Sequence, residues 1–337
     1  MSLDAKERVA ETLSSGYVGQ GPRVEEFEAE LARLLSLPYP PLATANGTQA
    51  LDLAYHLLGV GPGTSVVTTP MTCVATNMPL LHRRTQIIWA DVNAATGLID
   101  PLDVRRKVRD DTVAIVAVDW SGRPCDYESL REIGIPVVQD GAHSILAPTV
   151  GGHYRMWSFQ AIKHLTCGDG GALFVPEDQM ERADRVRWYG LNRKDDSDYR
   201  CYQDIPEAGY KYGMNDVAAS IGLANLTHTE WIVARHRENA RRLSARLNLS
   251  IDDRSSYWVY PVLSKKRIEF ISSLMHLSVA ASEVHARNDK KKCFSSAIGG
   301  PLPGLDEFSH RQANIPCGWW LSPDDIEFVA RVTGEYL

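Results

Sequence analysis

Long apolar runs are absent from this chain of 337 residues, and none approaches the length needed to cross a bilayer. The N-terminus, MSLDAKERVAETLSSG, is amphipathic and charged and lacks the apolar core of a signal peptide. No CxxC spacing occurs, so we expect thiols of a reducing compartment and no metal site. The six cysteines are Cys73, Cys125, Cys167, Cys201, Cys293 and Cys317. These absences predict a soluble cytoplasmic protein with no membrane partner.

Basic clusters are also scarce. The formal net charge is −6, and no basic block is longer than Lys290-Lys291-Lys292, which argues against a nucleic-acid partner. The composition, 44% hydrophobic and 23% charged, is that of an ordinary globular protein. Because 337 residues exceed the usual size of one core, we expect two domains.

Short, β-branched apolar segments alternate with helical patterns through the first half of the chain. The expected strands are residues 65–69, 86–89, 113–118 and 135–139, and the expected helices between them are 74–81, 102–108 and 127–133. Such alternation predicts an α/β fold whose mainly parallel sheet lies between helices. Functional residues then belong at the carboxyl ends of the strands.

The pattern changes after a long helix expected at residues 229–247, which resembles a connector between domains. Beyond residue 255 a strand, a helix, a basic loop and a terminal helix predict a smaller C-terminal α+β domain. We therefore assign residues 16–228 to a large domain, and residues 1–15 with 229–337 to the small one. A polar segment at residues 192–204 is expected to be an exposed loop.

The stretch WSFQAIKHLTCGDGGAL, residues 157–173, combines a lysine with a glycine-rich turn. Lys163 precedes the turn at residues 168–171, and Ser158 lies five residues upstream. Glycines let a backbone approach a bulky group closely, and a lysine held there suits an amine nucleophile beside an anion site. The alternative is a solvated lysine before a hairpin, since most lysines are surface residues.

Two further segments favour a site over that alternative. Asn46, Gly47 and Thr48 open a helix expected at residues 49–58, and free N–H groups at a helix N-terminus bind anions. The same residues could simply cap the helix, with the same geometry. Asp140 follows the strand at 135–139, about two dozen residues before the candidate lysine, which favours a functional carboxylate at a strand end.

Five motifs occur in one order: Gly-Pro-x-Val-Glu-x-Phe-Glu (21–28), Asn-Gly-Thr-x-Ala-Leu (46–51), Gln-Asp-Gly-Ala-His (139–143), Ser-Phe-x-x-x-Lys (158–163) with Gly-Asp-Gly-Gly (168–171), and Gly-Tyr-x-Tyr-x-Met-Asn-Asp (209–216). This series resembles the DegT/DnrJ/EryC1/StrS family of sugar aminotransferases. The resemblance implies the aspartate aminotransferase fold (fold type I), pyridoxal 5'-phosphate as cofactor, and a homodimer with shared active sites.

The resemblance also implies roles for individual residues. Lys163 resembles the lysine to which the cofactor is covalently attached and which then moves protons. Asp140 is similar to the acid that pairs with the pyridine nitrogen, and His143 occupies a position near the phenolic oxygen. Gly47, Thr48 and Ser158 match the phosphate-binding positions. No metal is implied.

The chain departs from the family pattern at several positions. Cys73 falls where members often carry an aromatic residue that stacks on the cofactor ring. Lys211 replaces an asparagine that reaches the phosphate of the other subunit, and it could serve there as a charge. The remaining candidates for substrate binding are Tyr17, His285, Arg287 and Asn288. The last three lie in a segment that could equally be a solvated loop.

The resulting hypothesis is an aminotransferase that moves an amino group from glutamate to a keto group of a nucleotide-linked sugar, for polysaccharide, glycan or antibiotic sugar biosynthesis. One alternative is a related enzyme acting on a cyclitol or another secondary-metabolite precursor. The other is a non-catalytic protein that binds the cofactor. Lys163 argues against the family's dehydratase branch, in which the lysine is replaced.

Overall fold

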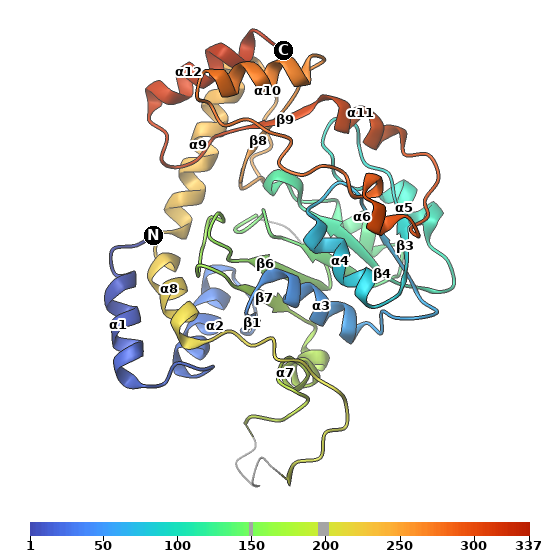
Figure 1. Cartoon of the computed structure of the whole chain (residues 1–337), viewed down its shortest axis with the longest axis vertical. Coiled ribbons are helices and arrows are strands. Elements are labelled where there is room, and N and C mark those ends of the chain that lie inside the picture. Colours follow the sequence, from blue (N-terminus) through green and yellow to red (C-terminus); the bar gives the residue numbers. More distant parts are fainter. Residues whose placement is uncertain (148–150, 195–201) are drawn as a thin grey trace.

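A seven-stranded sheet forms the centre of the computed structural model, which describes residues 1–147, 151–194 and 202–337 (Figure 1). The strand order is β1-β7-β6-β5-β4-β2-β3. The strands are β1 (Leu42–Thr44), β2 (Ser65–Thr68), β3 (Gln86–Trp89), β4 (Thr112–Val118), β5 (Val137–Asp140), β6 (Tyr154–Ser158) and β7 (Gly171–Phe174). β7 runs antiparallel to β1 and β6, whereas the other described pairs are parallel. The carboxyl ends of six strands therefore meet at one edge, which confirms the predicted mainly parallel sheet.

Helices cover both faces of this sheet. Successive residues of a strand point to opposite faces, so Val66 packs with Leu53 in one apolar cluster while Val67 packs with Val104 in another. The helices of this part are α1 (Ala5–Ser15), α2 (Pro22–Leu34), α3 (Gly47–Leu57), α4 (Val74–His82), α5 (Pro101–Lys107), α6 (Tyr127–Arg131), α7 (Met180–Arg187) and α8 (Asp216–Leu226). Part of the loop expected at residues 192–204, including Cys201, lies outside the described residues.

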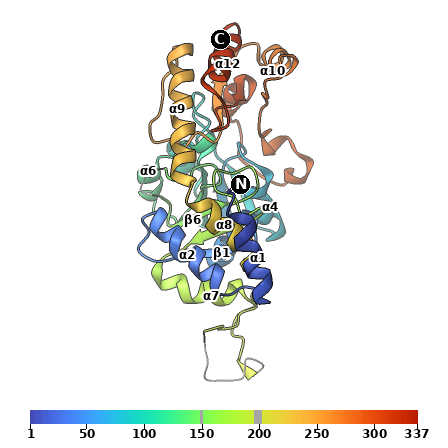
Figure 2. The ribbon, with the colours of Figure 1, turned by 90° about the vertical axis from the view of Figure 1, so that its left-hand side faces the viewer.

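The C-terminal part has its own apolar core around a two-stranded antiparallel sheet. The strands are β8 (Tyr260–Leu263) and β9 (Gln312–Ile315), and the helices are α9 (Thr229–Leu247), α10 (Arg267–His276), α11 (Pro303–Arg311) and α12 (Pro323–Gly334). Figure 2 shows α9 running from the end of α8 up to this part. A capping box at Ser322 and Asp325 begins α12.

Two segments pack differently from the predicted domain division. Helix α1 lies on α8 of the large domain, where the Thr12 hydroxyl is 2.7 Å from that of Ser220, so residues 1–15 pack with the large domain. Residues 288–308 return to the large sheet, and the Trp89 amide donates to the Ile298 carbonyl at 2.6 Å. Four apolar residues of this segment join the main cluster of the large domain: Phe294, Leu302, Leu305 and Phe308. These contacts span some 200 residues of sequence, so local patterns carry no sign of them.

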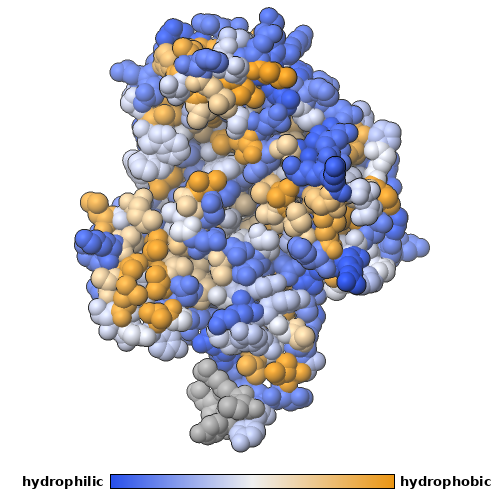
Figure 3. Space-filling model, in the orientation of Figure 1, coloured by the Kyte–Doolittle hydropathy of each residue, from blue (hydrophilic) through white to orange (hydrophobic). Residues whose placement is uncertain are grey.

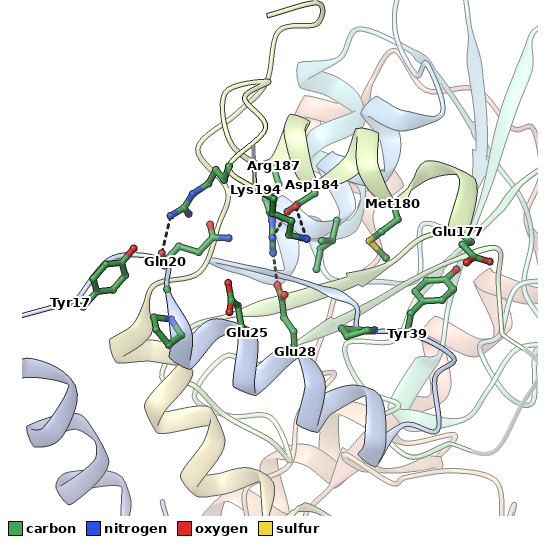
Figure 4. A pocket seen from close by; sticks show the side chains of 15 residues that line it. Tyr17, Gln20, Glu25, Glu28, Tyr39, Glu177, Met180, Asp184, Arg187 and Lys194 are labelled. Atoms are coloured by element: carbon green, nitrogen blue, oxygen red, sulfur yellow. Dashed lines mark hydrogen bonds and ion pairs between the residues drawn. The ribbon is translucent and has the colours of Figure 1, made fainter. Parts of the chain in front are cut away.

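A buried ion cluster fastens α2 to β1 and α7. Arg187 is 3% exposed and donates to Glu28, to Asp184 and to the carbonyl of Ala43 (Figure 4). The Ala43 amide in turn donates to the Glu28 carboxylate at 2.7 Å. Burial raises the pKa of Glu28, and Arg187 opposes that rise. The cluster lines an open pocket of about 880 Å³.

Replacing Arg187 by methionine should lower the stability of the chain by roughly 3–5 kcal/mol, because the Glu28 carboxylate would stay buried without its cation. The measurement is the urea midpoint followed by near-ultraviolet circular dichroism. Arg185→Met is the matched control, since Arg185 lies on the same helix and makes an exposed pair with Glu181, worth about 1 kcal/mol or less. Equal losses in the two variants would contradict a structural role for the cluster.

Candidate active site

A cavity of about 660 Å³ opens at the edge of the sheet where the strands end. The loops after β1 and β2, the ends of β5 and β6, and two residues of the C-terminal part, Trp258 and His285, form its wall. The predicted site residues that line it are Gly47, Thr48, Cys73, Asp140, His143, Ser158, Lys163 and His285. Motifs separated by more than a hundred residues therefore come together at one place.

Asp140 ends β5 and lies buried, with 4% of its surface exposed. The Thr76 hydroxyl donates to Oδ2 at 2.7 Å, and the Ala142 amide donates to Oδ1 at 3.1 Å. Burial raises the pKa of this carboxyl above its ordinary value, while the two donors and the Lys163 ammonium oppose that rise. The cavity thus contains a fixed carboxylate shielded from water.

Lys163 lies between β6 and β7 and extends into the cavity. Its Nζ is 3.8 Å from the centroid of the Trp258 ring. Burial lowers the pKa of this amine to about 8, and the negative charge of Asp140 partly counteracts the decrease. A large fraction of Lys163 is consequently neutral near pH 8, which is the form able to attack a carbonyl.

The N-terminus of α3 faces the same cavity. The Asn46 side chain caps this helix by accepting from the Gln49 amide at 2.9 Å, while the amides of Gly47 and Thr48 have no acceptor within the helix. A Cβ atom on Gly47 would lie 3.1 Å from the Cβ of Ser158. One on Gly171 would lie 2.7 Å from the backbone of Asn46 and Gly47. Glycine at both positions lets the helix end, the Ser158 hydroxyl and β7 approach closely, which forms an anion cradle.

Aromatic side chains form a stack along the opposite wall. His143 packs on Trp258 with ring centroids 4.0 Å apart and planes at 21°, and the His285 ring lies beside both, 5.6 Å from His143 and 6.4 Å from Trp258. Burial, followed by the Lys163 charge, lowers the pKa of His143, so its imidazole is neutral at pH 7. Among the described residues, Nδ1 of His143 has no hydrogen-bond partner although it is buried. This nitrogen is free to bond a ligand.

Four predicted site residues lie outside the cavity. Tyr17 lines the pocket beside Glu28, and Lys211 is exposed, with its Nζ 4.9 Å from the Trp188 ring centroid. Arg287 pairs with Asp289 and Asp306. Asn288 is buried and donates to the carbonyl of Thr72 at 2.8 Å. Within this chain, none of the four contributes to the cavity wall.

Sequence reasoning missed two residues of the site. Trp258 lines the cavity with its ring stacked on His143 and 3.8 Å from Nζ of Lys163, whereas Cys73, the N-cap of α4, brings no aromatic ring there. Thr76 holds Asp140 from α4, and only its position four residues after Thr72 on a helix hinted at a polar face. Trp258 lies just before β8, which begins at Tyr260.

Comparisons with known proteins agree with the motifs. The family model of the DegT/DnrJ/EryC1/StrS aminotransferase family matches residues 2–333. The chain belongs to this family. The crystal structure of the sugar aminotransferase CalS13 from Micromonospora echinospora is 34% identical to it, with a TM-score of 0.93 over 99% of this chain and 97% of that one. AtS13 from Actinomadura melliaura is 36% identical, with a TM-score of 0.93 over 100% and 97%.

A curated relative extends the comparison to Bacillus subtilis (strain 168). Its spore coat polysaccharide biosynthesis protein SpsC is 31% identical over 253 residues, which cover 70% of this chain and 64% of the relative. The predicted fold type I architecture is confirmed by the solved structures. Within the described part of the chain, no helix is both long and apolar enough to span a membrane.

Replacing Lys163 by methionine should stabilise the cofactor-free protein near neutral pH. Burial lowers the pKa of Lys163 from 10.5 to about 8. Below pH 8 the folded state therefore bears the full cost of a buried charge, at most about 3 kcal/mol. Between pH 8 and 10.5 the unfolded chain binds more protons at this site, so stability rises with pH.

Urea unfolding of the cofactor-free protein at pH 7 and pH 10 measures both effects. The difference in stability between Lys163→Met and the native chain should be large at pH 7 and small at pH 10. A difference independent of pH would mean that the amine is hydrated and its pKa ordinary.

Proposed function

We propose that this chain is a pyridoxal-phosphate-dependent aminotransferase that moves an amino group from glutamate to the keto group of a nucleotide-linked sugar. The observation that carries the proposal is the meeting of the Lys163 amine, the Asp140 carboxylate and the N-terminus of α3 in one cavity. An attacking amine, an acid for a ring nitrogen and an anion cradle are the groups that hold this cofactor in aminotransferases.

The residues present fit the cofactor in two independent ways. Glycine at position 47 lets the start of α3 lie close to the Ser158 hydroxyl, where a Cβ would be crowded, and Gly47, Thr48 and Ser158 all line the cavity. The first amides of α3 and this hydroxyl are donors that suit a phosphate. The unpartnered Nδ1 of His143 is a polar atom that a bonding group of the cofactor, such as its phenolic oxygen, would satisfy. The small side chain of Ala142, which lines the cavity, would border the ring.

When bound, the cofactor supplies the carbon that accepts the amino group and a ring that takes up electrons. The protein supplies the rest. Lys163, neutral at slightly alkaline pH, attaches the cofactor and afterwards moves a proton at its Nζ. The buried Asp140 carboxylate keeps a proton on the ring nitrogen, because a protonated nitrogen gives this desolvated carboxylate a cationic partner. Burial of both groups keeps water from the reacting atoms.

The relatives support the proposed substrate class. The structure of CalS13 is described as that of a sugar aminotransferase, and SpsC is named for spore coat polysaccharide biosynthesis. The cavity opens between the two parts of the chain, with Gln160, Ile162 and Asp169 among its lining residues. A sugar could enter here while its nucleotide stays outside. A homodimer belongs to the same proposal.

Two observations support a second copy beside the site. Figure 3 shows apolar surface over the part that contains α1, where four large apolar side chains are exposed: Leu3, Leu13, Tyr17 and Val18. A cluster of such residues on a protein surface usually marks an interface. The loop beside Tyr17 packs against the segment of Lys211, since Gln20 would meet any side chain on Gly213. Lys211 is exposed and lies outside the cavity of its own chain, which supports a role in the site of a second chain.

The first test concerns Lys163. Protein loaded with pyridoxal 5'-phosphate should absorb in the visible, and borohydride should remove that band and leave the label on Lys163 in peptide mass spectra. Lys163→Ala should lower transamination by several powers of ten, because it removes the covalent attachment and the base. Lys266→Ala is the control for a non-specific label, because Lys266 is exposed beside α10 and pairs with Glu269.

Label on another lysine would refute the assignment. Adding glutamate should shift the absorption band, whereas a non-catalytic cofactor-binding protein would show no shift. Mass spectrometry of reactions with nucleotide-linked 3-keto and 4-keto sugars then identifies the acceptor. Turnover of a cyclitol ketone in place of every nucleotide sugar would refute the proposed substrate class.

The second test concerns Lys211. If Lys211 of the partner subunit binds the cofactor phosphate, Lys211→Ala should weaken cofactor binding by roughly 1.5–3 kcal/mol. Mixed dimers of Lys211→Ala with Lys163→Ala chains should regain one native site, because each chain supplies what the other lacks. Absorbance at limiting cofactor measures this recovery. No recovery on mixing, with both homodimers intact, would contradict a site shared between subunits.

A further inference from the structure

Trp258 reaches from the C-terminal part of the chain to the residues around Lys163. Its Nε1 donates to the carbonyl of Ile162 at 2.9 Å, which fixes the indole against the residue before the lysine. One face stacks on His143 at 4.0 Å, and the Lys163 Nζ lies 3.8 Å from the ring centroid. The indole thus contacts the Lys163 amine, the backbone of Ile162 and the ring of His143.

The backbone beside Trp258 adopts a conformation that L-residues rarely use. Tyr257 has φ 49°, in the left-handed region, and a β-branched or aromatic residue there is strained. The amides of Ser256 and Trp258 donate to the carbonyls of Gly122 and Ser121, each at 3.0 Å. These bonds fasten the strained turn to the short helical turn that follows β4, Trp120–Gly122.

A second set of hydrogen bonds holds the same turn. Nδ1 of the buried His236 lies 2.8 Å from the carbonyl oxygen of Tyr257, and the Cys317 thiol donates to that oxygen at 3.2 Å. The Ser256 hydroxyl donates to the carbonyl of His143 at 2.6 Å. Groups from α9, from the segment after β9 and from the large domain therefore converge on three consecutive residues. Such convergence is expected where a strained backbone serves the site and not only the fold.

We propose that Trp258 is a positioning residue whose indole face holds the free Lys163 ammonium and sets its proton affinity during the reaction. This inference rests on the proposed function, in which Lys163 alternates between an attached and a free amine. An aromatic face attracts a cation by its quadrupole and attracts a neutral amine much less. The ring therefore stabilises the protonated form at the moment when the amine is free.

Two influences on Lys163 act in opposite directions. Burial by the surrounding wall disfavours the charge, whereas the ring and the nearby carboxylate favour it. The titratable groups that face the amine are Cys73, Asp140, His143, His164 and His285. The histidines have pKa values lowered mainly by burial, so they are neutral at pH 7 and do not compete for the ring.

The test measures the pKa of Lys163 in the full chain freed of cofactor. Competitive acetylation at a series of pH values, read as the acetylated fraction of the Lys163 peptide by mass spectrometry, reports the amine alone. Trp258→Leu and Trp258→Met keep an apolar cover without a quadrupole, and Trp258→Phe keeps a smaller face. Trp231→Leu is the matched control, since Trp231 is exposed on α9 and stacks near Trp319.

We expect Trp258→Leu and Trp258→Met to lower the pKa of Lys163 by about half a unit to one unit. Trp258→Phe should lower it less, and Trp231→Leu should leave it unchanged. A Leu or Met variant with the native value, or with a higher one, would overturn the inference, and either variant suffices if the other does not fold. The acetylation needs no cofactor, so native protein that fails to bind pyridoxal 5'-phosphate would refute the proposed function while this result stays readable.

Discussion

Lys163 is kept in a cavity where little water reaches it, and this burial lowers the pKa of its amine to about 8. A charged amine in such a place needs partners, and a neutral one needs to be close to its target. The surrounding elements answer both needs. β5 brings a carboxylate, α4 brings the hydroxyl that holds that carboxylate, and the C-terminal part brings an aromatic face. The carboxylate, the hydroxyl and the aromatic face are all positioned around the Lys163 amine.

Sequence reasoning predicted the elements whose signal is local. The strand before Asp140, the turn after Lys163 and the cap at Asn46 each lie within a few residues of the group they position. The alternation of strands and helices then predicted that these ends meet. Trp258 was not predicted as a site residue because its contact with Ile162 spans 96 residues and leaves no periodic pattern in the sequence. β6 was not predicted as a strand because Arg155 interrupts its apolar residues. β9 was not predicted because it lies in a segment that was expected to be a basic loop.

The predicted residues outside the cavity illustrate a different limit. Lys211 was predicted to serve the site of another subunit, and contacts within one chain do not test that prediction. Arg287 was selected for its charge, but two carboxylates already neutralise it. A guanidinium bound in this way contributes to the packing of the segment around residue 288. A charged residue indicates ligand binding only when it has no partner within the protein. Only the three-dimensional structure shows whether it has one.

The return of residues 288–308 to the large sheet has a consequence for the order in which the chain is made. A ribosome delivers the N-terminal half first, and domains usually fold as they emerge. Here the main apolar cluster includes Phe294 and Phe308, and Ile298 pairs with the edge strand β3. The sheet therefore keeps an uncovered apolar surface until nearly the whole chain has been synthesised. Completion of the large domain and arrival of the last residues of the cavity wall, His285 among them, become nearly simultaneous events.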